Sequence, residues 1–118
     1  ILTGEAYLQS SKLAAIKGPF NGYAENQEPM LRVLRKHLDC AEKLYSNIND
    51  KNLYDDSELI DEARSVWHGA IQLADNYGVR NSQATVLAPT GTIAFLMDCA
   101  TTGIEPELAL VKYKKLVG

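Results

Sequence analysis

Apolar residues recur every three or four positions along the first two thirds of the chain, which is the spacing of one face of an α-helix. The pattern is most continuous between Asp55 and Gly78. Asp55 with Glu58 is typical of a capped helix start, and Gly78 is typical of a helix stop. The apolar face of this helix consists of Leu59, Ala63, Val66, Trp67, Ala70, Ile71, Ala74 and Tyr77. We expect this face to supply most of the core.

Two further helices are predicted before it. Thr3 can cap the first, which should end at Gly18-Pro19, and Pro29 suits the first position of the second, which should end near Ser46. The apolar positions are Ala6, Leu13, Ala14 and Ile16 in the first helix and Met30, Leu34, Leu38, Ala41 and Leu44 in the second. The polar stretch 47–54 reads as a surface connection.

The pattern changes after Gly78. A strand is predicted over 84–87. The sequence Thr85 to Ala88 is apolar on both faces, as in a strand that is covered on both sides within a parallel sheet. A short helix over Thr92 to Met97, a loop from Thr101 to Pro106 and an extended segment over 109–113 should follow. One strand cannot form a sheet alone, so it predicts a larger α/β structure. We expect a mainly α chain with one or two short strands, forming a single segment, 1–118, with a helical part, 1–78, and a mixed part, 79–118.

Composition excludes several classes of protein. The chain has 118 residues, of which 46% are hydrophobic and 23% charged, as in one soluble globular domain. A net charge of -3 argues against nucleic-acid binding. The sequence contains no membrane span and no secretory signal. Cys40 and Cys99 have no metal or redox spacing, so we expect two free thiols in the cytoplasm; the sequence leaves a disulfide open but requires none.

Candidate chemistry centres on the sequence Ala84 to Ala94, which reads as strand, turn and helix start. The first N–H groups of a helix lack hydrogen-bond partners within the helix and can form a binding site for an anion, often a phosphate. Pro89 fits the turn, Gly91 allows close backbone approach, and Thr90 and Thr92 add hydroxyl donors. No Lys follows Gly91, so this is not a Walker loop. A purely structural corner between strand and helix is the alternative interpretation.

Other polar residues have simpler interpretations. His37 and His68 lack partners at metal-ligand spacing, which predicts structural or solvent-facing roles and no metal site. Cys99 has no neighbouring His to activate it, so we expect a packed or partly buried thiol. Glu105 is one carboxylate without a partner, and an anchoring role for its loop is expected before a catalytic one.

Several sequence motifs are found along the chain: Asn81 to Ile93, Met97-Asp98-Cys99, Thr101 to Pro106 and Leu110 to Leu116, together with Gly18-Pro19-Phe20, Gly22-Tyr23 and Glu28 to Val33. Through these motifs essentially the whole chain resembles the adenosylcobalamin-dependent, class II ribonucleotide reductases. The family usually has Asp after the Asp-Cys pair, where this chain has Ala100. Any role of that acidic side chain is therefore lost here.

The resemblance implies a fragment of a ten-stranded α/β barrel. It also implies that the parent protein reduces ribonucleoside diphosphates to deoxyribonucleotides by a cobalamin-initiated thiyl radical mechanism. Pro89, Thr90, Gly91, Thr92 and Ile93 would then bind the substrate phosphates, whether of a diphosphate or a triphosphate. The catalytic cysteines and the adenosylcobalamin site would lie outside these residues, so the segment alone should be inactive.

The expected partners are the nucleotide substrate and the remainder of the barrel. The segment on its own is also expected to self-associate through apolar surface that the barrel would cover. A free-standing helical interaction module without catalysis, which has kept the loop but has no substrate, is the alternative function.

Overall fold

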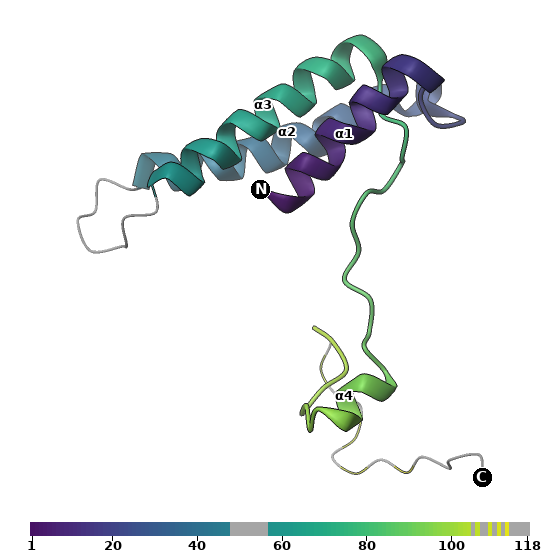
Figure 1. Ribbon diagram of the computed structural model, residues 1–118, viewed down its shortest axis with the longest axis vertical. Coiled ribbons are helices and arrows are strands. Elements are labelled where there is room, and N and C mark those ends of the chain that lie inside the picture. Colours follow the sequence, from purple (N-terminus) through teal and green to yellow (C-terminus); the bar gives the residue numbers. More distant parts are fainter. Residues whose placement is uncertain (48–56, 105, 107–108, 110, 112, 114–118) are drawn as a thin grey trace. The chain divides into compact units, whose positions relative to one another are not determined.

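The computed structural model describes residues 1–47, 57–104, 106, 109, 111 and 113 (Figure 1). These residues form four helices: α1 (Leu2–Lys17), α2 (Tyr23–Asn47), α3 (Ser57–Tyr77) and α4 (Thr92–Leu96). The chain divides into two compact units, Ile1–Thr85 and Val86–Gly118. The predicted mainly helical character is confirmed. None of the described helices is long and apolar enough to cross a membrane.

In the first unit, α3 packs against both α1 and α2. The core cluster consists of Tyr7, Tyr23, Leu31, Leu34, Ala41, Trp67, Ala70, Ala74 and Val79. The predicted apolar face of α3 is confirmed in its middle, where Val66, Trp67, Ala70 and Ala74 are buried. At its ends the prediction is wrong, because Leu59 and Tyr77 are 57% and 50% exposed. Periodicity reports which face of a helix a residue occupies, but not how far along the helix its neighbours reach.

Helix α1 buries Ala14, as predicted, but it does not bury Leu13 or Ile16. Its buried residues are Gly4, Tyr7, Ser10, Ser11 and Ala14. Leu13 and Ile16 were expected in the core, but they are exposed, Ile16 at 81%. The two helices pack closely at Gly4, because a Cβ on this residue would lie 2.8 Å from Cγ1 of Val66. A residue without a side chain is therefore required at this point of the contact between α1 and α3.

The buried serines of α1 satisfy their hydroxyl groups locally. Ser11 Oγ donates to the carbonyl of Tyr7 at 3.0 Å, and Ser10 Oγ donates to Oδ1 of Asn81 at 3.0 Å. Thr3 does not cap this helix. Its N-cap is Ile1, with no side-chain cap, and Oγ1 of Thr3 lies 3.3 Å from Oγ1 of Thr85. Polar groups can thus occupy a helix interface at little cost when each has a partner.

Helix α2 begins six residues before the predicted start at Pro29, which lies inside it. Proline cannot donate a hydrogen bond to the preceding turn, so an interior position has a cost. Burial of Tyr23 offsets that cost: its hydroxyl donates to the carbonyl of Ala74 at 3.1 Å, and its ring meets Phe20 edge-on at 5.4 Å. The end of α2 at Asn47 confirms the prediction near Ser46. Leu44, which we expected in the core, is 58% exposed because it lies beyond the reach of the core cluster.

Gly18 and Gly78 end α1 and α3 as predicted. Their N–H groups donate to the carbonyls of Ala14 and Ala74, each at 2.8 Å. After Gly78, Val79 is fully buried. The N–H of Arg80 then donates to the carbonyl of Ser10 at 3.1 Å, which ties the chain to α1. The predicted cap at Asp55 lies outside the described residues.

The predicted strand over 84–87 is not formed, and the described residues contain no strand. Val86 and Leu87 are 73% and 79% exposed. A strand is defined by hydrogen bonds to a neighbouring strand, and no described segment provides one. Of the extended segment expected over 109–113, residues 110 and 112 lie outside the described residues, and 109, 111 and 113 are not in a strand.

Candidate functional site

The second unit contains the predicted loop, which leads into α4. This helix confirms the predicted short helix and ends one residue earlier than expected, at Leu96. Gly91 is its N-cap, with φ 56° and ψ -120°, and the N–H of Ala94 donates to the carbonyl of Gly91 at 3.1 Å. Side-chain-bearing residues rarely adopt this backbone conformation. A Cβ on Gly91 would meet no atom within 4 Å, so the space above it is open.

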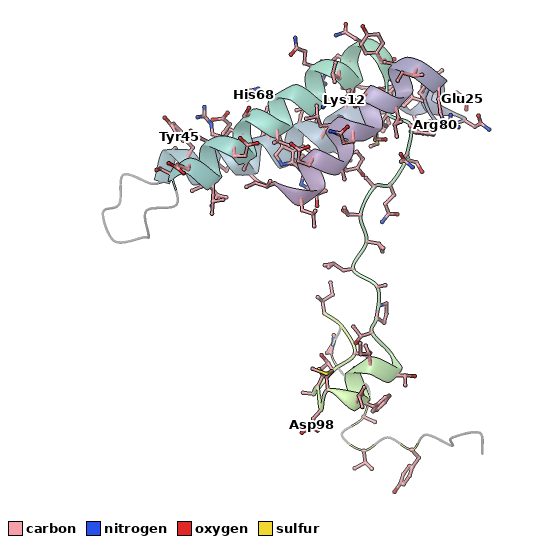
Figure 2. All side chains as sticks on the ribbon, in the orientation of Figure 1. Lys12, Glu25, Tyr45, His68, Arg80 and Asp98 are labelled. Atoms are coloured by element: carbon pink, nitrogen blue, oxygen red, sulfur yellow. The ribbon has the colours of Figure 1, made fainter. Side chains whose placement is uncertain are left out.

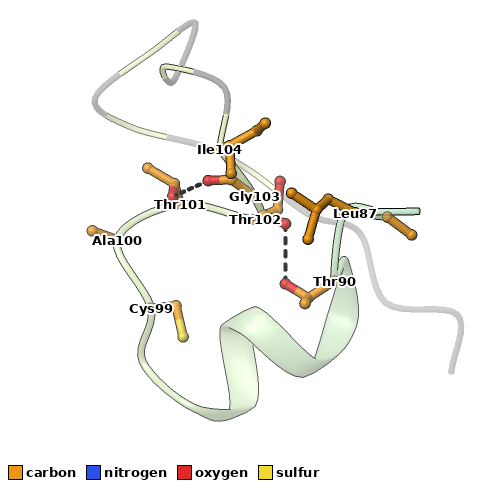
Figure 3. Close-up of a pocket in the computed structure, with 9 residues that line it drawn as sticks. Leu87, Thr90, Cys99, Ala100, Thr101, Thr102, Gly103 and Ile104 are labelled. Atoms are coloured by element: carbon orange, nitrogen blue, oxygen red, sulfur yellow. Dashed lines mark hydrogen bonds between the residues drawn. The ribbon is translucent and has the colours of Figure 1, made fainter. Parts of the chain in front are cut away.

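Thr90 connects the loop to a turn beyond α4 (Figure 3). Its N–H donates to the carbonyl of Thr102 at 2.7 Å, and its hydroxyl donates to the same oxygen at 3.1 Å. The hydroxyl of Thr101 donates to the carbonyl of Gly103 at 2.9 Å. The structure therefore brings together two segments that the sequence analysis treated separately.

A hollow of about 420 Å³ lies between these segments (Figure 3). Its walls are small or apolar for the most part, and they are formed by Leu87, Ala88, Thr90, Cys99, Ala100, Thr101, Thr102, Gly103 and Ile104. This volume lies in the range of sites for small molecules. Of the five predicted phosphate-binding residues, Thr90 lines the hollow, whereas Pro89, Gly91, Thr92 and Ile93 do not.

Cys99 is exposed, so the expectation of a packed or partly buried thiol is wrong. Ala94 is the only buried residue among those described in this unit. One short helix with two loops is too little chain to enclose a thiol. Both Cys40 and Cys99 are free, as predicted. Glu105 lies outside the described residues.

The two histidines have structural roles, as predicted. The ring of His37 stacks on Trp67. His68 lies on α3 (Figure 2). It belongs to a cluster between α2 and α3, in which its Nε2 lies 3.0 Å from Oε1 of Glu42. Within the described residues, no three His, Cys, Asp or Glu side chains are grouped so that they could hold a metal ion.

Glu42 is the centre of this cluster, which the sequence analysis missed. Its Oε2 accepts a hydrogen bond from Nε of Arg64 at 2.9 Å, and the guanidinium of Arg64 lies 3.8 Å from the ring centroid of Tyr45. The hydrogen bond from Arg64 is the main reason why the pKa of Glu42 is lowered. Glu42 and Arg64 lie on different helices, so no local pattern could have paired them. The cluster joins α2 to α3.

Comparison with known proteins identifies the family. The family model described as "Ribonucleotide reductase, barrel domain" matches residues 1–118. The chain belongs to this family. The resemblance inferred from the sequence is therefore confirmed.

Several curated ribonucleotide reductases are similar to the chain. The vitamin B12-dependent ribonucleotide reductase of Rhodopirellula baltica is 52% identical over 118 residues, which are 100% of this chain and 11% of that protein. The enzyme of the same name from Streptomyces coelicolor is 48% identical over 100% of this chain and 12% of its own length. A vitamin B12-dependent ribonucleoside-diphosphate reductase of Thermoplasma acidophilum is 38% identical over 62% of this chain and 10% of its own length. The chain thus spans about a tenth of the length of these ribonucleotide reductases.

Proposed function

We propose that these 118 residues are a segment of an adenosylcobalamin-dependent ribonucleotide reductase. The observation that carries this proposal is the 52% identity to a vitamin B12-dependent reductase over the whole chain. That match includes the loop before α4 as well as the helices. It favours the reductase over a free-standing helical module that keeps the loop without a substrate. The strand absent from the described residues would form only with the neighbouring strands of an α/β barrel.

The role of this segment in the reaction is to hold the substrate phosphates. We assign this role to the loop from Pro89 to Ile93, on the resemblance and on the open space beside Gly91. A glycine with no atom near its Cβ position lets the phosphate oxygens approach the main-chain N–H groups. The hollow beside Thr90 is large enough for the part of a nucleotide next to the phosphates.

By binding the phosphates, this loop would contribute to catalysis by positioning the substrate, and it would not take part in the chemical steps themselves. A fixed phosphate places the ribose in one position relative to a radical-carrying cysteine elsewhere in the parent protein. When bound, adenosylcobalamin would supply the radical that starts the reaction. The hollow beside Thr90, at about 420 Å³, is too small for a cofactor of that size. We therefore place the cobalamin site outside this segment, and the segment alone would be inactive.

The full-length protein tests this proposal. It should convert ribonucleoside diphosphates or triphosphates to deoxyribonucleotides in the presence of adenosylcobalamin and a dithiol reductant, and it should form no product without the cobalamin. Chromatography of the nucleotides measures both results. A correctly folded protein that forms no deoxyribonucleotide with either substrate class, or that forms it equally well without cobalamin, would contradict the proposal. The same reaction predicts a cytoplasmic protein.

A further inference from the structure

Both hydrogen-bond donors of Thr90 converge on one oxygen atom, the carbonyl of Thr102. The main-chain N–H lies at 2.7 Å and the hydroxyl at 3.1 Å from it. A carbonyl oxygen has two lone pairs and can accept both bonds at once. The two residues are twelve positions apart, with α4 between them. The two hydrogen bonds therefore join the segment that precedes α4 to the segment that follows it.

The backbones of the same two segments also come close to each other at a second point. A Cβ at Gly103 would lie 3.8 Å from Cα of Pro89, which is ordinary van der Waals contact. The turn is also braced internally, because the hydroxyl of Thr101 donates to the carbonyl of Gly103 at 2.9 Å. Pro89 and Gly103, which are next to Thr90 and Thr102 in the sequence, therefore lie close to each other. Leu87 and Ile104, on the two segments, face the same hollow.

We propose that Thr90 is a positioning residue that fixes the turn 101–103 beside the loop 89–93. It would set the width of the hollow that receives the substrate, and it would leave the phosphate to other groups of the loop. A hydroxyl and an N–H that already donate to a carbonyl are not available to a phosphate oxygen at the same time. This inference rests on the proposed function of the loop and assigns a separate task to one of its residues. A turn held in place before the substrate binds need not be ordered during binding, which lowers the cost of association.

The test uses the substrate-free full-length protein. Thr90→Val removes the hydroxyl and keeps the shape, Thr90→Ser keeps the hydroxyl, and Thr85→Val is a control in the other unit. Amide hydrogen exchange, measured by mass spectrometry, should be about threefold to tenfold faster in peptides covering 99–104 for Thr90→Val, the factor expected for one lost hydrogen bond. Thr90→Ser and Thr85→Val should exchange like the unmodified protein. The substrate KM should rise by a similar factor in Thr90→Val and be restored in Thr90→Ser.

Unchanged exchange in Thr90→Val would overturn the inference, whatever happens to substrate binding. If the KM of that variant rose without faster exchange, the hydroxyl would contact the phosphate directly. Should Thr90→Val fail to fold by circular dichroism, Thr90→Ala gives the same comparison with Thr90→Ser. The exchange measurement needs no substrate, so a failure of the phosphate assignment at Gly91 would be seen separately.

Discussion

The imidazole of His37 lies flat on the indole of Trp67, with ring centroids 4.7 Å apart and an interplanar angle of 7°. Tyr7 contacts the same indole, at 6.2 Å between centroids. His37 lies on α2, Trp67 on α3 and Tyr7 on α1. Trp67 is only 5% exposed. One side chain therefore connects all three helices of the first unit.

Replacing Trp67 by Ala should destabilise this unit strongly. Truncation of a buried Trp costs about 3–5 kcal/mol, because it removes buried apolar area and leaves a cavity. Urea denaturation followed by circular dichroism at 222 nm would measure the change in the free energy of unfolding. Tyr77→Ala, at a half-exposed aromatic residue of the same helix, should cost much less. Equal losses in the two variants would show that Trp67 is not the central contact.

The contact between α1 and α3 predicts opposite effects for two glycines. Gly4→Ala should be destabilising by about 1–3 kcal/mol, because its Cβ would lie 2.8 Å from Val66 and 3.2 Å from the indole of Trp67. Gly69→Ala places its Cβ 3.4 Å from the flexible end of Leu8. It should be neutral or stabilising, by up to about 1 kcal/mol, since Ala favours helix. Thermal unfolding of both variants measures this, and a stabilising Gly4→Ala would refute the close packing.

Glu42 makes stability depend on pH. Its pKa in the folded chain is lowered, first by the hydrogen bond from Arg64, from an ordinary value of 4.5. A carboxyl with a lowered folded pKa stabilises the fold above its unfolded pKa, and this stabilisation is lost as the pH falls through the folded pKa. The urea concentration at the midpoint of unfolding should therefore fall as the pH is lowered from about 5 to about 1, which is the range in which paired carboxylates lose their stabilising effect.

Glu42→Gln should flatten this acid dependence, whereas Glu62→Gln, at an exposed carboxylate of α3, should leave it unchanged. Urea titrations at a series of pH values would compare the three proteins. Identical acid profiles for Glu42→Gln and the unmodified chain would rule out the contribution of the pair with Arg64.

Sequence periodicity predicted the helices well where large apolar residues pack, as at Val66 and Trp67. It failed in part for α1, where Gly4, Ser10 and Ser11 are buried although they are not large apolar residues, while Leu13 and Ile16 are exposed. It also failed at Pro29, where the burial of Tyr23 outweighs a local helix-breaking preference. In both helices, contacts with residues that are distant in the sequence determine which residues are buried and where the helix begins.

The candidate site shows the same limit. The turn at Pro89 and the start of α4 after Gly91 were predictable, because Pro and Gly impose local backbone geometry. The bonds from Thr90 to Thr102 were not, because a threonine hydroxyl carries no signal of its partner. The strand predicted over 84–87 depends on neighbouring strands, and the part of the chain that the structure describes contains none.

The isolated chain should self-associate. Leu2 and Ile16 are 80% and 81% exposed in the first unit, and Leu87 and Leu96 are 79% and 83% exposed in the second. Exposed apolar surface of this kind promotes association. Light scattering should give a mass above that of a monomer, and a dye sensitive to apolar surface should fluoresce. A monomer without dye signal would argue that no larger structure normally covers these residues.

The assignment of the phosphates to the loop 89–93 is tested most directly by substrate binding to the Gly91→Val variant of the full-length protein. Val at this position meets no protein atom within 4 Å of its Cβ, so its side chain would occupy the space assigned to the phosphate. Gly18→Val is the matched control, since Gly18 has φ 77° and equally open surroundings. Calorimetry should show substrate affinity lowered at least about tenfold, or about 1.4 kcal/mol, only in Gly91→Val, with cobalamin affinity unchanged in both. A folded Gly91→Val protein with normal substrate affinity would contradict the account.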